Sequence, residues 1–136
     1  MILLDTSVLS LAFRRAPGPG TGSPAARALE RLIIEDAPLA VPGIVVQELL
    51  SGVRGEGQVA RLETALEGFP VLLAQRADHV AAARIANACR RHGVVVTTID
   101  CLIAALAVAH DAELFTADQD FTRMTPWCGL RLLDIT

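Results

Sequence analysis

The 136-residue chain contains no lysine and no tyrosine, so all of its basic residues are arginines. The absence of lysine excludes a catalytic lysine, a Schiff base and a P-loop lysine, and the absence of tyrosine excludes a tyrosine nucleophile. Cysteine is scarce, because only Cys89, Cys101 and Cys128 occur, widely spaced and odd in number. This pattern makes no zinc motif and fits a reducing compartment, so we expect a cytoplasmic protein.

Long hydrophobic runs are absent as well. No stretch of about eighteen residues is free of charge, which predicts no membrane-spanning helix. No signal peptide is expected, because Asp5 interrupts the first apolar run and no basic region precedes it. The chain is nevertheless 52% hydrophobic, with a mean hydropathy of +0.45. We therefore expect a single folded domain over residues 1–136 that covers part of its apolar surface with a partner.

Apolar runs and helix-like segments alternate along the chain. Strands are predicted at 2–4, 38–41, 71–73, 113–116 and 130–133, and helices at 8–14, 23–36, 42–51, 55–67, 76–92 and 99–110. The first strand is apolar on both faces, as inner strands of parallel sheets are. The alternation predicts an α/β fold with a mostly parallel sheet of about five strands flanked by helices.

Four acidic residues stand in unusual positions. Asp5 and Asp118 follow predicted strands, Glu48 lies in a short apolar helix, and Asp100 lies in the first turn of an alanine-rich helix. Each has an ordinary explanation. Asp5 could begin a turn, and Glu48 could reach solvent. Asp100 could be stabilised by the dipole of its helix, and Asp118 could form an Asx turn. Asp120 is either a helper of this group or another turn residue.

Taken together, these acids predict a metal site. In a parallel α/β sheet the carboxyl ends of the strands and the starts of the following helices share one rim, where ligands bind. Carboxylates that converge there repel one another unless a cation is present. Oxygen ligands without a nearby histidine suit Mg²⁺ or Mn²⁺, and such an ion suits phosphodiester hydrolysis.

Four segments in order carry a family resemblance: Met1–Ser7 (MILLDTS), Gln47–Leu49 (QEL), Asp100–Ala105 (DCLIAA) and Thr116–Phe121 (TADQDF). The set resembles the PIN domains, and most closely the VapC-type ribonuclease toxins of prokaryotic toxin–antitoxin pairs. The resemblance implies a PIN-like fold and a Mg²⁺- or Mn²⁺-dependent endoribonuclease. It also implies an acidic quartet of Asp5, Glu48, Asp100 and Asp118, with Thr6 or Ser7 supporting Asp5.

The same resemblance implies partners. Such toxins usually form homodimers and are silenced by a cognate antitoxin whose tail covers the site. The predicted helices at 23–36 and 55–67 are the candidate surfaces for the dimer. No membrane partner is expected.

RNA binding needs separate support, because the chain has a net charge of −3 and a pI near 5.5. Only arginines can hold the substrate, and the candidates near the rim are Arg14, Arg15, Arg54 and Arg123. The alternative function is a non-catalytic PIN-like module that binds RNA or protein. A receiver-type phosphoacceptor domain is excluded, because it needs a lysine.

Overall fold

The computed structural model describes residues 1–13 and 22–135. Its five strands form one parallel sheet in the order β3-β2-β1-β4-β5. The strands are β1 (Ile2–Leu4), β2 (Leu39–Pro42), β3 (Val71–Leu72), β4 (Glu113–Phe115) and β5 (Arg131–Leu132). The predicted α/β fold with a parallel sheet of about five strands is confirmed.

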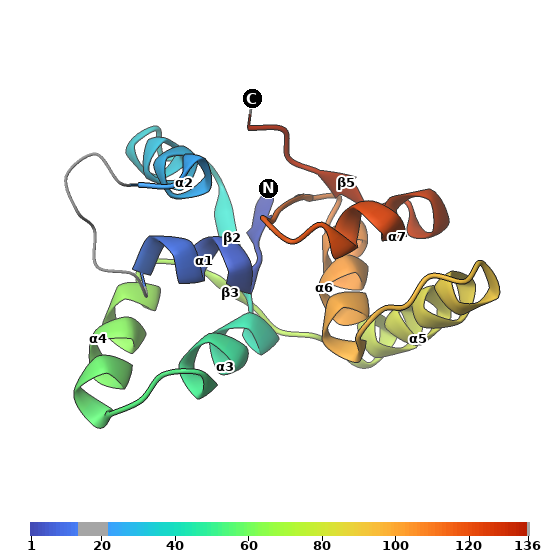
Figure 1. The fold of residues 1–136 in the computed structure, drawn as a ribbon, viewed down its shortest axis with the longest axis horizontal. Coiled ribbons are helices and arrows are strands. Elements are labelled where there is room, and N and C mark those ends of the chain that lie inside the picture. Colours follow the sequence, from blue (N-terminus) through green and yellow to red (C-terminus); the bar gives the residue numbers. More distant parts are fainter. Residues whose placement is uncertain (14–21, 136) are drawn as a thin grey trace.

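Seven helices in the described residues cover the sheet in two groups. They are α1 (Thr6–Phe13), α2 (Pro24–Ile34), α3 (Gly43–Ser51), α4 (Glu56–Leu66), α5 (Arg76–Arg91), α6 (Thr98–Ala109) and α7 (Asp120–Cys128). In Figure 1, α1 to α4 lie on the left of the sheet and α5 to α7 on the right. None of these helices combines the length and apolarity that a membrane crossing requires.

Helix α7 was not predicted from the sequence. Its nine residues contain Pro126, which discourages a helix assignment, and its amphipathic pattern is short. The helix forms because Phe121 and Met124, three residues apart, are both fully buried against the core. Gly129 then ends it with a left-handed backbone (φ 74°).

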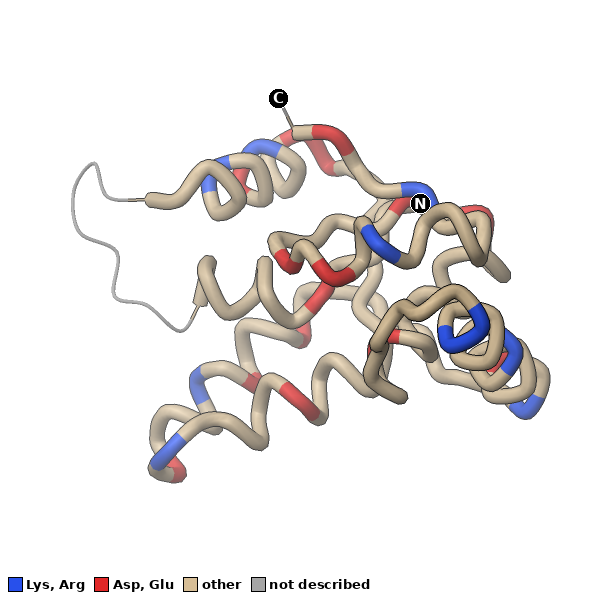
Figure 2. The backbone as a smooth tube through the Cα atoms, turned by 45° about the vertical axis from the view of Figure 1, so that its right-hand side comes forward, with Lys and Arg blue, Asp and Glu red and all other residues tan. Residues whose placement is uncertain are grey.

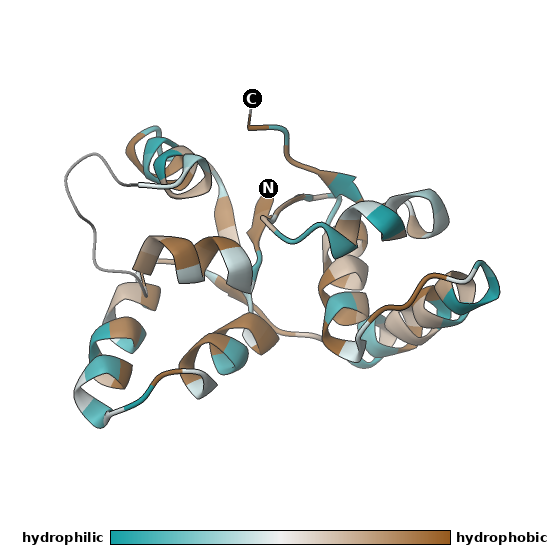
Figure 3. Ribbon diagram, in the orientation of Figure 1, coloured by the Kyte–Doolittle hydropathy of each residue, from teal (hydrophilic) through white to brown (hydrophobic). Residues whose placement is uncertain are grey.

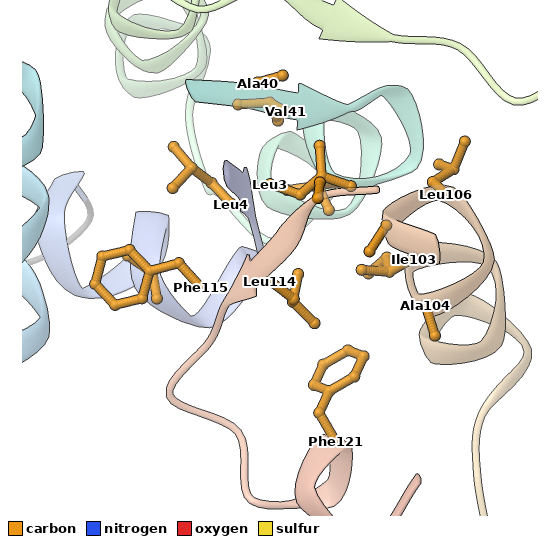
Figure 4. Packing of buried hydrophobic residues seen from close by; sticks show 14 of the residues in the cluster. Leu3, Leu4, Ala40, Val41, Ile103, Ala104, Leu106, Leu114, Phe115 and Phe121 are labelled. Atoms are coloured by element: carbon orange, nitrogen blue, oxygen red, sulfur yellow. The ribbon is translucent and has the colours of Figure 1, made fainter. Parts of the chain in front are cut away.

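The core sits on both faces of β1 and β4. Leu3 pairs with Leu114 and Leu4 with Phe115, and all four side chains are buried. Figure 4 shows Leu3 and Leu114 directed toward α6, and Leu4 and Phe115 on the opposite side. Full burial of each such side chain contributes about 1.5–3 kcal/mol. In Figure 3 the apolar colour dominates α1 and α3, whereas α2, α4 and α5 mix apolar and polar residues.

The sheet has one point where the strand order reverses. From β1 the chain proceeds to β2 and β3 on one side and then crosses to β4 on the other. The backbone N–H of Asp5, directly after β1, donates to the carbonyl of Phe115 at the end of β4 (3.0 Å). Ligands of open α/β sheets bind in the crevice at such a reversal, so the ends of β1 and β4 mark the expected position of a site.

Candidate metal and active site

Among the residues that the structure describes, Asp5 is the one charged residue that is buried, and 4% of its surface is exposed. Two hydroxyl groups donate to its Oδ2: Ser7 Oγ at 2.8 Å and Thr116 Oγ1 at 2.7 Å. Hydrogen bonds to an ionised carboxylate are about twice as strong as neutral ones, so they fix the side chain firmly. Because both hydroxyls use Oδ2, the described residues leave Oδ1 for a ligand.

The loop after β4 is tied to Asp5 through the same hydroxyls. Thr116 Oγ1 accepts the N–H of Asp118 (3.0 Å), and Ser7 Oγ accepts the N–H of Ala117 (2.9 Å). Asp118 Oδ1 in turn accepts the N–H of Asp120 (2.9 Å). Each hydroxyl therefore donates to Asp5 and accepts from the loop, which couples the position of Asp118 to that of Asp5.

Asp100, Asp118 and Asp120 form the tightest acidic group. Each offers one carboxylate oxygen, and these three oxygens lie within 4.8 Å of one another. Asp120, left open by the sequence as a helper or a turn residue, therefore belongs to the cluster. Below, "acidic cluster" means these three residues together with Asp5 and Glu48.

The electrostatics of Asp100 link it to the other predicted acids. Burial is the main cause that raises the pKa of Asp100 to about 6, and the negative charges of Asp5, Asp118 and Glu48 raise this pKa further. A side-chain hydrogen bond with Thr97 lowers the pKa of Asp100 and so acts in the opposite direction. Asp100 is thus close enough to each of the other three predicted acids for their charges to repel its own.

Glu48 reaches the cluster from α3 and is half-buried rather than solvated. The Thr6 hydroxyl donates to its Oε1 in a short hydrogen bond. Helix α1 begins at Thr6, so Thr6 and Ser7 lie inside its first turn, where their hydroxyls face the two acids. The expected support of Asp5 comes from Ser7, whereas Thr6 positions Glu48.

One residue of the site was not singled out from the sequence. Thr116 joins Asp5 to Asp118, and its place follows from the pairing of β1 with β4. Because Leu4 pairs with Phe115, Thr116 is the first residue after β4 just as Asp5 is the first after β1. That register becomes visible only in the folded sheet.

The arginines that the structure describes mostly lie away from the acidic cluster. Figure 2 shows acidic segments near the middle of the molecule and arginine segments mainly around its edge. Arg54 is exposed after α3, and Arg123 pairs with Asp120 at 3.4 Å on an exposed surface. Arg14 and Arg15 lie outside the described residues. His92 stacks on Trp127, with ring centroids 3.7 Å apart, at the far end of α5.

The donor set fits a hard divalent cation. The cluster offers only carboxylate oxygens. One oxygen each of Asp100, Asp118 and Asp120 lies within 4.8 Å of the other two, which is close enough for one ion to bind all three at metal–oxygen distances of about 2 Å. Burial is the main cause of the raised pKa of Asp100, and the repulsion from Asp5, Asp118 and Glu48 adds to it. Such an ion would remove the repulsion.

Comparison with known proteins identifies relatives along nearly the whole chain. The family model described as PIN domain matches residues 2–125. Ribonuclease VapC11 of Mycobacterium tuberculosis is 42% identical over 124 residues, which cover 89% of each chain. A VapC ribonuclease of Mycobacterium bovis matches with the same identity and coverage.

Solved structures agree in fold. A chain in the crystal structure of FitAcB from Neisseria gonorrhoeae has 25% sequence identity to this chain and superimposes with a TM-score of 0.78. The match covers 99% of this chain and 98% of that chain. VapBC2 from Rickettsia felis, bound to a DNA fragment from its promoter, is 23% identical with a TM-score of 0.77 and 98% coverage of both chains.

Proposed function

The chain belongs to the PIN-domain family, and from this membership and its acidic cluster we propose that it is a Mg²⁺- or Mn²⁺-dependent endoribonuclease, the toxin of a VapBC-type toxin–antitoxin pair. It would hydrolyse RNA phosphodiester bonds with water. The observation that carries the proposal is the convergence of carboxylates at the end of β1 and β4 in a chain 42% identical to VapC ribonucleases.

The residues that would hold the ion are Asp5, Glu48, Asp100 and Asp118, with Asp120 beside them. A bound divalent ion supplies an activated water and stabilises the leaving oxygen during in-line attack on phosphorus.

The remaining residues position these ligands. Ser7 and Thr116 hold Oδ2 of Asp5, and Thr6 holds Glu48 by one oxygen. Ligating carboxylates are usually oriented by such hydrogen bonds, and losing one typically costs 10–100-fold in affinity or activity.

Partners follow from the same proposal. A cognate antitoxin would cover the acidic cluster, and the toxin would form a homodimer through α2 and α4. Exposed Ile33 and Ile34, 47% and 75% exposed at the end of α2, support a covered surface there. Light scattering at micromolar concentration tests the dimer, and a monomer would contradict it.

RNA would be held by arginines, for which Arg14, Arg15, Arg54 and Arg123 remain the candidates from the sequence. A double Arg14/Arg15→Ala variant should bind RNA more weakly and with a shallower salt dependence, while Mn²⁺ binding stays unchanged. An unchanged affinity and salt slope would assign these two arginines a structural role.

The alternative, a non-catalytic PIN-like module, is tested by the same cleavage assay. Structured RNA is incubated with wild type, Glu48→Gln or Glu35→Gln, in Mg²⁺ and in EDTA. Glu35 is exposed at the end of α2, so it is a matched control. We expect cleavage by wild type and Glu35→Gln only with Mg²⁺, and at least about a tenfold loss in Glu48→Gln. Absence of cleavage in wild type would favour the alternative.

A further inference from the structure

Helix α7 carries a stripe of three side chains that begins at the acidic cluster. Asp120, Arg123 and Trp127 are three and then four residues apart, so they lie on one face of the helix. Phe121 and Met124 occupy another side of the helix, which is fully buried. From Asp120 to Trp127 the stripe extends for about 10 Å, at 1.5 Å per residue. It therefore leads from a residue of the acidic cluster to the far end of α7.

The stripe ends at an aromatic pair, Trp127 and His92. Their rings are stacked, with centroids 3.7 Å apart and planes 12° from parallel. His92 follows the last turn of α5, and its Nδ1 donates to the carbonyl oxygen of Ala88 (2.8 Å), which fixes the imidazole. Figure 1 shows α5 and α7 ending at the same side of the molecule. Trp127 stays 38% exposed although His92 covers one face of its ring, so the pair presents an ordered aromatic surface to solvent.

Arg123 supplies a cation between the acidic cluster and the aromatic pair. Its side chain is 68% exposed, and its guanidinium lies 3.4 Å from Oδ1 of Asp120. An exposed ion pair of this kind contributes little to stability, so the guanidinium can turn to another anion at small cost. The planar guanidinium is well suited to phosphate. The stripe thus offers, in order, an acid of the cluster, a cation for phosphate and a ring surface.

This order of groups fits single-stranded RNA. Proteins hold single strands with cations along the backbone and with aromatic side chains on which bases stack. A length of about 10 Å corresponds to about three stacked nucleotides, at about 3.4 Å each. An acidic peptide would use only the arginine, and an apolar partner would use only the aromatic pair. A nucleic-acid strand uses both.

We propose that Trp127 and His92 form a stacking platform for one base of the RNA substrate, and that Arg123 binds a phosphate between this base and the scissile bond. The proposal rests on the proposed nuclease function and adds a recognition site for the nucleotides on one side of the cleaved bond. Because every base has a ring face, the platform selects single-stranded over double-stranded RNA rather than one sequence.

Trp127 is the one tryptophan of the chain, so its fluorescence reports directly on the platform. The wild type is titrated in EDTA, so that cleavage does not interfere, with a single-stranded RNA of about ten nucleotides. The same strand in a duplex and inorganic polyphosphate, which has phosphates but no bases, are the comparison ligands. We expect the single strand to change the fluorescence, and the duplex and polyphosphate to leave it nearly unchanged.

Two pairs of variants separate the ring from the cation. Trp127→Leu removes the aromatic ring, whereas Trp127→Phe keeps one. Arg123→Ala removes the cation of the stripe, whereas Arg131→Ala removes another exposed arginine that is likewise paired with an aspartate, Asp111. The readouts are the affinity for a labelled RNA strand, its salt dependence, Mn²⁺ affinity, and molar mass by light scattering.

We expect Trp127→Leu to weaken RNA binding at least about fivefold, the loss typical of one stacked base, and Trp127→Phe to stay within about twofold of wild type. Arg123→Ala should weaken RNA binding and reduce the salt slope by about one phosphate, and Arg131→Ala should not. Trp127→Leu should leave Mn²⁺ affinity and molar mass unchanged, because its ring lies two helical turns from Asp120.

Three results overturn the proposal. Labelled RNA that fails to bind wild type, or binds without changing the fluorescence of Trp127, shows that RNA does not use the platform. Equal affinities of wild type and Trp127→Leu show the same. A changed molar mass of Trp127→Leu assigns the aromatic pair to contact between copies instead. A wild type that binds RNA on the platform but does not cleave it would defeat only the proposed nuclease function, so the two failures are distinguishable.

Discussion

Replacing Asp100 by asparagine should stabilise the metal-free protein. The pKa of this carboxyl rises from 3.8 to about 6 in the folded chain, chiefly because of burial, so the folded state binds more protons than the unfolded state between these values. The free energy of unfolding therefore falls as pH rises from about 4 to 6. The full shift corresponds to about 3 kcal/mol, which we reduce to about 1–2 kcal/mol because the half-buried side chain is screened by solvent.

The assay is urea unfolding in EDTA at pH 4 and pH 7.5. We expect wild type and Asp100→Asn to have similar stability at pH 4, because the wild-type carboxyl is then largely protonated in the fold. At pH 7.5 the variant should be more stable by about 1–2 kcal/mol. Glu35→Gln, which removes one exposed negative charge, should show no such gain. A variant that is equally or less stable than wild type at pH 7.5 would refute the reasoning.

Thr116→Val removes the hydroxyl that joins Asp5 to the loop, so we expect a loss of about 1–2 kcal/mol in urea unfolding together with a loss of cleavage. Thr125→Val, which removes an exposed hydroxyl of α7, is the control, and equal losses in both would deny Thr116 a special role. Arg123→Ala frees Asp120 from its ion pair, so calorimetry should show tighter Mn²⁺ binding, and weaker binding would place Asp120 outside the metal site.

Most of the fold could be predicted because its strands are short apolar runs separated by helices with clear ends. The central strand was recognisable because Ile2, Leu3 and Leu4 leave no polar face. Helix α7 could not be predicted, because burial of Phe121 and Met124 by the rest of the fold outweighs the unfavourable Pro126. The helix propensity of the local sequence does not include the stabilisation that comes from burying these two side chains.

The candidate site was predictable to the extent that it follows strand ends. The predicted topology alone puts Asp5, Asp100 and Asp118 on one rim of the sheet. The contact of Thr116 with Asp5 could not be anticipated, because it joins residues 111 positions apart through the pairing of β1 with β4. Asp120 is ambiguous for a related reason: the same local sequence is compatible with an Asx turn and with a metal ligand.

Anomalous diffraction from crystals soaked in Mn²⁺ tests the central claim most directly, because it locates the ion itself. The account predicts a peak within about 2 Å of carboxylate oxygens of Asp100 and Asp118, with Asp5 also in reach. The peak should disappear in crystals of Asp118→Asn soaked in the same way. No peak at the acidic cluster at saturating Mn²⁺, or a peak that persists unchanged in the variant, would contradict the account.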